Sequence, residues 1–470
     1  MNGVIVRIAS IEIHNFKNVI SGTLEFDNLR KKYNASILGL YGQNGSGKTA
    51  LIDALTLLKC ALSGRSIPAS YGECIHIDAD YAELNYQIKI EDIKSNTKYH
   101  VIYSFRLKKE QLTPDEIMQD PQQKEKYRIV LFDEYLGTSY QNETKKQRQQ
   151  LVVDTRTNES AFLPKTKYDI LTGGNKTVAT DLLVARKLAA QTAKSFIFSS
   201  ECQKIIRENC SEEYLKFMMR SLTNYGKSEL FVINTKSTAI ISLNGLPLSF
   251  KYNDKDWGAF GEFSIPLWEA STVPDHILDI LQKIIDNMNI VLEQLIPGLT
   301  IGIVKLGEQL MEDGAKAHRI QLVSLKNKKA IPLQFESEGI KKIISILQLL
   351  IVVYNHPSIT VAIDELDAGI FEYLLGELLK IISEKGKGQL IFTSHNLRPL
   401  ETIDRGFIAF TTMNPENRYI RLSNVKSNNN LRDFYYRDII LGEQNETVYD
   451  PTNNYEIALA FREAGENLAT

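Results

Sequence analysis

Residues Ile37–Ala50 read ILGLYGQNGSGKTA, and within them Gly42–Thr49 match the pattern G-x-x-x-x-G-K-[S/T] at every fixed position. A short apolar run precedes the match, and an apolar-periodic segment follows it as far as Leu58. This order predicts a strand, a glycine-rich loop and a helix, which is the context in which the pattern forms a phosphate-binding loop. A chance glycine-rich turn would explain the lysine but not the strand and helix around it.

The residue types within Gly42–Thr49 indicate binding of a nucleotide phosphate chain. Glycines let the backbone wrap closely around phosphates and direct N–H groups at them, and the N-terminus of the following helix favours an anion. We expect Lys48 to reach the β- and γ-phosphates and Thr49 to place its hydroxyl on Mg²⁺. The expected cofactors are therefore ATP and Mg²⁺, held by Gly42, Gln43, Asn44, Gly45, Ser46, Gly47, Lys48 and Thr49.

Two acidic residues follow an apolar run in the segment Ile359–Gly369, ITVAIDELDAG. Two solvated carboxylates at a strand end would show the same letters. A buried strand that emerges beside a phosphate loop, however, is where a metal ligand and a water ligand are needed. We therefore expect Asp364 to hold Mg²⁺, directly or through water, and Glu365 to polarise the attacking water as a general base or as a positioning group.

A histidine follows the next apolar run, in the sequence QLIFTSHN at Gln389–Asn396. One interpretation is a histidine on a surface loop. In α/β sheets, however, polar residues at the carboxyl ends of strands line the ligand crevice, so we expect His395 to contact the γ-phosphate. The catalytic residues expected from the sequence are Lys48, Glu365 and His395.

The composition of the 470 residues is that of a globular protein, with 43% hydrophobic and 24% charged residues. The formal charge of −2 does not indicate a nucleic-acid partner, but it does not exclude a local basic groove. No secretory signal pattern opens the sequence, and the longest apolar run, near Ile343–Tyr354, is too short to span a bilayer. We expect a cytoplasmic protein with reduced thiols at Cys60, Cys74, Cys202 and Cys210.

Hydrophobic periodicity predicts several elements outside the motifs. Alternation predicts strands over residues 8–26 and a hairpin over residues 81–107. The polar run KKQRQQ at 145–150 is expected to be a solvated helix face or a loop. Helical periodicity covers residues 180–222, and an amphipathic helix is expected over residues 274–295.

The simplest organisation is one nucleotide-binding domain built from both ends of the chain. We assign residues 1–107 to its first half, which carries the phosphate loop, and residues 268–425 to its second half. Residues 108–267 then form an inserted, mainly helical lobe, and residues 426–470 form a C-terminal tail.

Five segments in this order resemble the ABC-type ATPases of the RecF, SMC and OLD group, over about half of the chain. The resemblance implies an α/β fold with an ABC-type P-loop nucleotide-binding domain that is split between the chain ends. The segments are IEIHNFKNV (Ile11–Val19), GQNGSGKT (Gly42–Thr49), FESEGIKK (Phe335–Lys342), VAIDELDAG (Val361–Gly369) and FTSHN (Phe392–Asn396).

The resemblance also assigns roles across a dimer. Ser337 and Gly339 occupy the signature position and would bind the γ-phosphate held by the opposite protomer. Asp367 lies where a D-loop contacts the partner, His395 corresponds to the switch histidine, and Gln87 falls where a Q-loop could lie. The signature differs from the LSGGQ of transporters, and Ile370 and Phe371 stand where many relatives carry a His-Pro pair.

The sequence leaves several functions open. Small stand-alone ATPases of this group resemble components of anti-phage systems such as PARIS, Septu and abortive-infection types. That interpretation implies a switch or scaffold ATPase that assembles with itself and controls a separate effector, such as a nuclease. The alternative is a RecF-like DNA-repair ATPase that clamps duplex DNA. A transporter ATPase is disfavoured by the signature, and a nucleotide-binding scaffold that scarcely hydrolyses is disfavoured by Glu365.

Overall fold

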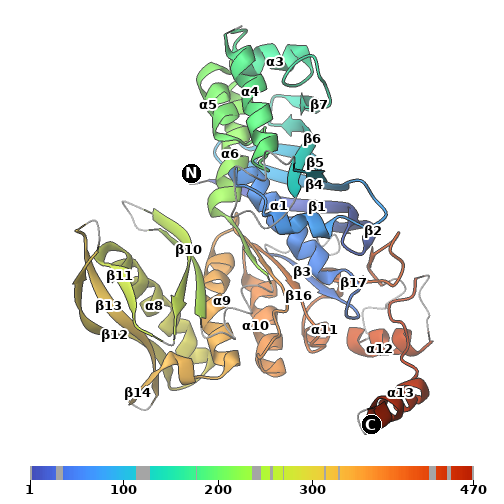
Figure 1. Ribbon diagram of the computed structural model, residues 1–470. Helices are drawn as coiled ribbons and strands as arrows, with labels where there is room; N and C mark the ends of the chain where they lie inside the picture. The colour runs from blue at the N-terminus through green and yellow to red at the C-terminus, as the bar shows by residue number, and fades with distance from the viewer. Residues whose placement is uncertain are drawn as a thin grey trace.

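The computed structural model (Figure 1) describes residues 3–27, 35–112, 127–175, 177–234, 245–253, 258–267, 269–311, 314–326, 329–422, 430–441 and 446–467. The described strands form four sheets, two of six strands, one of four and one of two. Helix α1 (Lys48–Ser63), which follows the phosphate loop, lies between the two six-stranded sheets and contributes to a shared core.

The central sheet is mostly parallel, and helices cover both of its faces. Helices α1 and α6 (Glu213–Ser228) pack on one face, and α9 (Glu338–Asn355) and α10 (Glu372–Lys385) pack on the other. Burial on both faces explains why its strands are nearly continuous apolar runs. In spatial order the strands are β18 (Tyr419–Ile420), β17 (Ile408–Thr411), β3 (Ser36–Tyr41), β16 (Gln389–Thr393), β15 (Thr360–Ile363) and β8 (Leu230–Ile233).

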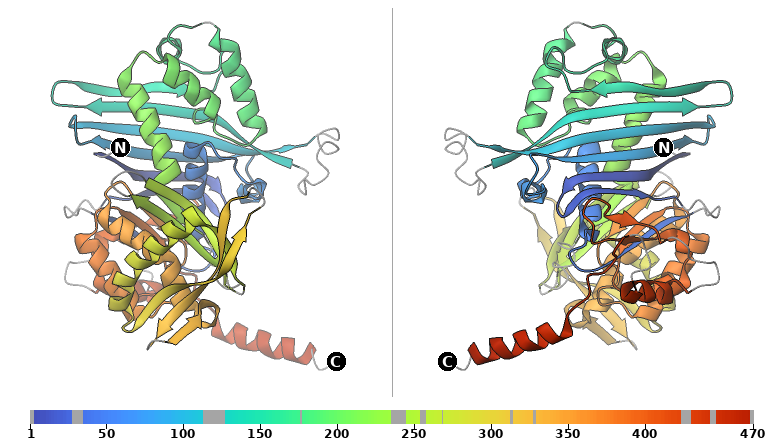
Figure 2. Two further views of the ribbon diagram at one scale, coloured as in Figure 1. Left: turned by 90° about the vertical axis from the view of Figure 1, so that its left-hand side faces the viewer. Right: turned by 90° about the vertical axis from the view of Figure 1, so that its right-hand side faces the viewer.

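The second six-stranded sheet is antiparallel throughout and stacks over α1 (Figure 2). Its strands alternate buried and partly exposed side chains, as a sheet with one face on a core does. The Oη of Tyr86 donates a 2.7 Å hydrogen bond to the carbonyl of Ala54 in α1. In spatial order the strands are β2 (Val19–Glu25), β1 (Val4–Phe16), β4 (Ala82–Asp92), β5 (Thr97–Gln111), β6 (Tyr127–Gln141) and β7 (Lys146–Asp154).

The prediction of a solvated helix or loop at 145–150 is wrong, because Lys146–Asp154 forms strand β7. β7 pairs only with β6 in the described sheet, and most of its first residues are exposed. An edge strand buries few side chains and tolerates lysine, so its composition is similar to that of a solvated helix. β6 and β7 extend the N-terminal sheet, and the helices of the segment predicted as a helical insertion lie within residues 165–228.

Four helices form a lobe on the antiparallel sheet: α3 (Lys165–Thr172), α4 (Val178–Gln191), α5 (Ser200–Asn209) and α6. The last three confirm the helical periodicity over 180–222, whereas α3 lies before that range. A buried carboxylate joins the lobe to the sheet. Glu134 of β6 accepts the N–H of Phe196 at 2.6 Å and the hydroxyls of Ser195 at 2.5 Å and Tyr103 at 2.9 Å. Burial raises the pKa of Glu134, although these donors oppose the shift.

The described residues between 245 and 332 form a further lobe that leads into α9. Its amphipathic helix α8 (Asp275–Leu295) confirms the helix predicted over 274–295. In the described part of the chain, no helix is long and apolar enough to cross a membrane. The strands of this lobe are β9 (Gly245–Asn253), β10 (Gly258–Pro266), β11 (Ser271–Pro274), β12 (Leu299–Leu310), β13 (Lys316–Lys326) and β14 (Lys329–Pro332).

The C-terminal part of the chain contacts the phosphate loop and then extends away from the rest of the protein. The backbone N–H of Asp450 donates to Oε1 of Gln43 in the phosphate loop at 3.0 Å. Helix α13 (Asn454–Asn467) then extends away from the rest of the protein (Figure 2). Among the described residues, the remaining helices are α11 (Pro399–Thr402), α12 (Leu431–Leu441) and three short 3-10 turns at Ala69–Cys74, Leu333–Phe335 and Arg405–Phe407.

Candidate functional site

The phosphate loop joins β3 to α1, and glycines shape it. Gly45 has a φ of +77° and Gly47 a φ of +97°, which L side chains rarely adopt. Gly42 is required for space as well, because a Cβ there would lie 1.7 Å from Oγ1 of Thr411. The predicted strand, loop and helix are confirmed at this point of the chain.

Lys48 lies in the first turn of α1 and reaches back over the loop. Its Nζ donates to the carbonyl oxygens of Gly42 at 2.8 Å and Gln43 at 2.9 Å. The residue is 7% exposed, and this burial lowers the pKa of its ammonium group. The nearby carboxylates of Asp364 and Glu365 oppose the shift by favouring the charged form. A phosphate chain in the loop would offer the ammonium oxyanions in exchange for the two carbonyls.

Asp364 and Glu365 follow β15 and are held by one hydroxyl. Oγ1 of Thr393, at the end of β16, donates to Oδ1 of Asp364 at 2.5 Å and accepts the backbone N–H of Glu365 at 2.8 Å. Glu365 has a φ of +48°, a conformation that costs energy for a residue with a side chain. The chain turns sharply at Glu365, directly after Asp364. The two adjacent acids can therefore have different roles.

The acidic side of the site fits a divalent cation. Asp364 is 1% exposed, and its Oδ2 has no hydrogen-bond partner among the described residues. A buried carboxylate oxygen without a donor is costly unless a cation approaches it. Mg²⁺ prefers oxygen ligands, and the hydroxyl of Thr49 lies in the same pocket. When bound, Mg²⁺ would neutralise charge on the β- and γ-phosphate oxygens.

These groups line one pocket of about 450 Å³. Two residues after β1 contribute to it, although the sequence assigned them no role. Lys17 forms an ion pair with Asp53 of α1, and the side-chain amide of Asn18 donates to the carbonyl of Gly45. The lining residues are Lys17, Asn18, Asn44, Gly45, Gly47, Lys48, Thr49, Ala50, Asp364, Glu365 and His395.

His395 lies in this pocket, and Asp367 fixes the loop that carries it. Oδ2 of Asp367 accepts the backbone N–H groups of His395 at 3.1 Å and of Asn396 at 3.0 Å. One oxygen of the predicted D-loop aspartate is therefore engaged within its own chain. The pairing couples the segment after β15 to the segment after β16.

The residues predicted to form the signature lie outside the lining of this pocket. Ser337 caps α9, accepting the N–H of Ile340 at 3.3 Å. Gly339 packs against the segment after β15, where a Cβ would lie 2.0 Å from the carbonyl oxygen of Gly369. Gln87 lies on β4 with its side chain exposed, and it too is absent from the pocket lining.

Residues 7–398 match the family model of the AAA ATPase domain, well over half of the chain. The chain belongs to this family. The matched range contains the phosphate loop, Asp364, Glu365 and His395, which line the 450 Å³ pocket. This result confirms the ATPase fold expected from the order of the motifs.

Relatives of this AAA ATPase domain protein include a repair protein. A stretch of 76 residues is 36% identical to the DNA replication and repair protein RecF of Chlorobium phaeovibrioides (strain DSM 265 / 1930), covering 16% of this chain and 18% of that relative. An SMC head domain from Thermotoga maritima is 13% identical, with a TM-score of 0.34, over 89% of this chain and 99% of its own. The recombination mediator protein RecF with ATP gives the same identity and TM-score, over 89% and 100%.

Proposed function

We propose that this ATPase is a switch that assembles with a second copy of itself by holding ATP between the two copies. The observation that carries the proposal is that two groups of predicted site residues lie apart within one chain. The phosphate loop, the acids and His395 share a pocket, whereas Ser337 and Gly339 lie at the N-terminus of α9 outside its lining. A helix N-terminus is a ready site for an anion, and a second copy would bring it to the γ-phosphate.

The surface around the signature supports burial in an assembly. Phe335 is 72% exposed just before the signature, and Phe371 is 71% exposed just after the segment that packs on Gly339. Large aromatic side chains in such positions are characteristic of surfaces that associate. A second copy would cover both rings while it delivers Ser337 to the bound nucleotide.

Within the assembled site each residue has a distinct proposed role. Lys48 neutralises the β- and γ-phosphates, and Thr49 with Asp364 holds Mg²⁺. Glu365 orients the attacking water, and His395 contacts the γ-phosphate. Hydrolysis would weaken the contact between the copies, because the γ-phosphate is the group that both copies bind.

We propose further that the assembly controls a separate effector, such as a nuclease, in anti-phage defence. The support for this role is the compact segment between the motif-bearing halves of the chain, which resembles the compact helical insertion of small stand-alone ATPases of such systems. A second candidate is a RecF-like ATPase that binds duplex DNA. It is favoured by the identity shared with a RecF protein over 76 residues.

Measurement of molar mass with and without ATP tests the proposed assembly. Glu365→Gln should retain ATP and form a stable species of twice the monomer mass, because hydrolysis no longer ends the assembly. Adding Ser337→Arg to this variant should return it to monomer while ATP binding persists. A Glu365→Gln protein that binds ATP and stays monomeric would contradict the proposal.

Steady-state ATP turnover with and without duplex DNA distinguishes the two roles. Turnover that is independent of DNA favours the switch that controls an effector. Stimulation by DNA that disappears at high salt favours the RecF-like role, because phosphate contacts weaken as salt rises.

A further inference from the structure

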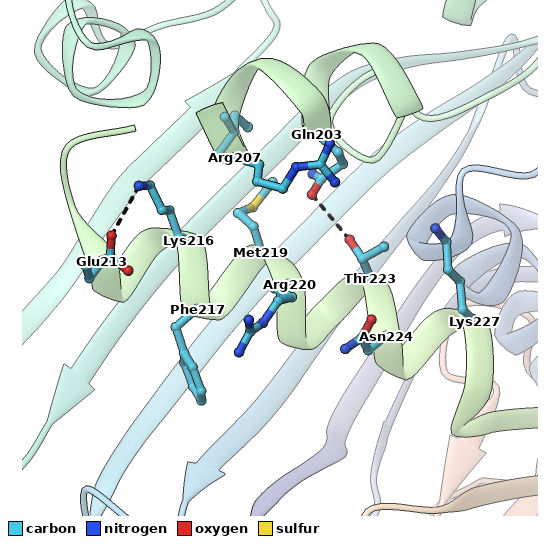
Figure 3. Close-up of a pocket in the computed structure, with 11 residues that line it drawn as sticks. Gln203, Arg207, Glu213, Lys216, Phe217, Met219, Arg220, Thr223, Asn224 and Lys227 are labelled. Atoms are coloured by element: carbon cyan, nitrogen blue, oxygen red, sulfur yellow. Dashed lines mark hydrogen bonds and ion pairs between the residues drawn. The ribbon is translucent and has the colours of Figure 1, made fainter. Parts of the chain in front are cut away.

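A groove of about 500 Å³ opens on the helical lobe between α5 and α6, away from the nucleotide pocket (Figure 3). Its walls combine cationic side chains with amide and hydroxyl groups. The hydroxyl of Thr223 in α6 donates a 3.4 Å hydrogen bond to Oε1 of Gln203 in α5. The nucleotide site described above uses none of the residues that line this groove.

The charge of the groove is strongly positive. Four cationic side chains line it and one carboxylate, Glu213, accompanies them. Glu213 pairs with Lys216 at 3.1 Å. Arg207, Arg220 and Lys227 are exposed and form no ion pair within the described residues. Three positive charges therefore remain uncompensated here, although the whole chain has a formal charge of −2.

The cations of α6 form a row along the helix. Lys216, Arg220 and Lys227 are separated by four and seven residues, spacings that return to the same side of a helix. At a rise of 1.5 Å per residue, the eleven steps from Lys216 to Lys227 span about 16 Å. Arg207 adds a charge from α5 on the other wall. Such a row matches a polymer whose charges repeat at regular intervals.

We propose that this groove binds the sugar–phosphate backbone of a nucleic acid without reading its bases. Arginine and lysine supply the charge that phosphates need. The aromatic ring in the lining, Phe217, packs on Tyr99 of the sheet at 5.6 Å, so the fold itself uses it. Binding then depends on charge and salt and is independent of sequence.

The groove lies on an element that leads into the nucleotide site. Gly226 of α6 packs against α1 so closely that a Cβ would lie 2.5 Å from Cβ of Leu62. The next strand, β8, pairs with β15, and the carbonyl of Ile233 accepts the N–H of Asp364 at 2.8 Å. A nucleic-acid backbone in the groove would thus contact α6, the helix that packs on α1 and leads into β8 beside β15. The binding itself does not depend on nucleotide hydrolysis.

Salt-dependent binding of a short fluorescent DNA duplex, measured by anisotropy without nucleotide, tests the proposal. Three phosphate contacts predict that log K falls with log[salt] with a slope of about −2.7. Arg220→Gln with Lys227→Gln should reduce the slope to about −0.9 and weaken binding at low salt. As a charge-matched control, Lys380→Gln with Lys385→Gln on the exposed side of α10 should leave the slope unchanged.

Several outcomes decide the proposal. Equal binding of two unrelated duplex sequences, with the slope lost in the groove variant alone, supports it. Absence of duplex binding at about 50 mM salt, or an unchanged slope in the groove variant, overturns it. Binding of polyglutamate but not of duplex DNA or RNA also overturns it and assigns the groove to an acidic protein.

Arg207→Gln provides a second variant on α5, and circular dichroism verifies folding. Because ATP is omitted, failure here leaves the proposed assembly untouched.

Discussion

Oγ1 of Thr393 lies 2.5 Å from Oδ1 of Asp364 and 2.8 Å from the backbone nitrogen of Glu365. The three residues meet because β15 and β16 are parallel neighbours whose carboxyl ends coincide. One hydroxyl thus orients the proposed Mg²⁺ ligand and fixes the backbone of the residue proposed to orient water. Thr393 is fully buried, so this geometry is protected from solvent.

Thr393→Val should lower kcat while ATP binding persists, because both acids lose their shared partner. A lost hydrogen bond to a charged group costs about 1.5–3 kcal/mol, which corresponds to roughly 10- to 150-fold in kcat. Steady-state ATP turnover with separate determination of kcat and KM measures this. Thr393→Ser keeps the hydroxyl and should restore most of the rate. Equal losses in the two variants would indicate a packing role instead.

The sequence predicts the phosphate loop well because all of its chemistry lies in one continuous segment. The positions of Asp364 and His395 follow from a general rule, since the carboxyl ends of parallel strands meet at one edge of the sheet. Thr393 could not be recognised in this way. It precedes His395 by two residues, but its partners lie 28 and 29 residues earlier in the chain, and a threonine at the end of a strand is also a common packing residue.

The sequence predicts the fold best where burial of one face gives the apolar residues a regular spacing. The amphipathic pattern of α8 reflects one buried face, so its limits are visible in the sequence. β7 is different, because its side chains between residues 146 and 150 are mostly exposed and little apolar alternation remains. The domain boundaries at 107, 267 and 425 remain predictions, as do the assigned roles of Ser337, Gly339 and Asp367.

Lys48→Ala should weaken ATP binding strongly. Lys48 is the buried cation of the loop, and a charge-assisted hydrogen bond contributes about 1.5–3 kcal/mol, or roughly 10- to 150-fold in affinity. Isothermal titration calorimetry with ATP measures the loss. Glu365→Gln serves as the control, because it removes a charge from the same pocket and should still bind ATP. Unchanged affinity of Lys48→Ala would contradict the role of the phosphate loop.

Gly339→Ala should separate α9 from the segment after β15. The added Cβ would lie 2.0 Å from the carbonyl oxygen of Gly369, so the backbone must shift. Forced overpacking costs about 1–3 kcal/mol of folding stability. We expect a lower Tm and loss of ATP-dependent assembly in the Glu365→Gln background, with ATP binding retained by each monomer. Gly465→Ala on exposed α13, where a Cβ meets open space, is the control and should behave as the unmodified protein.

Glu134→Gln should alter how stability depends on pH. Burial raises the pKa of Glu134 in the folded state, so the folded protein binds a proton more tightly than the unfolded chain. The stability that Glu134 contributes is therefore present at low pH and declines as pH rises from the ordinary glutamate range through the raised pKa. Glutamine keeps an acceptor for the N–H of Phe196 but cannot ionise.

As pH rises from about 5 to 8, the unmodified protein should lose stability relative to Glu134→Gln. The quantity to compare is the free energy of unfolding of the two proteins at each pH. Urea denaturation at several pH values, followed by circular dichroism, measures it. Glu134→Ala leaves three donors unpaired at the junction of β6 and the helical lobe, and should cost about 3 kcal/mol or more at every pH. A difference between Glu134→Gln and the unmodified protein that does not vary with pH would mean that Glu134 is ionised throughout, with its donors outweighing burial.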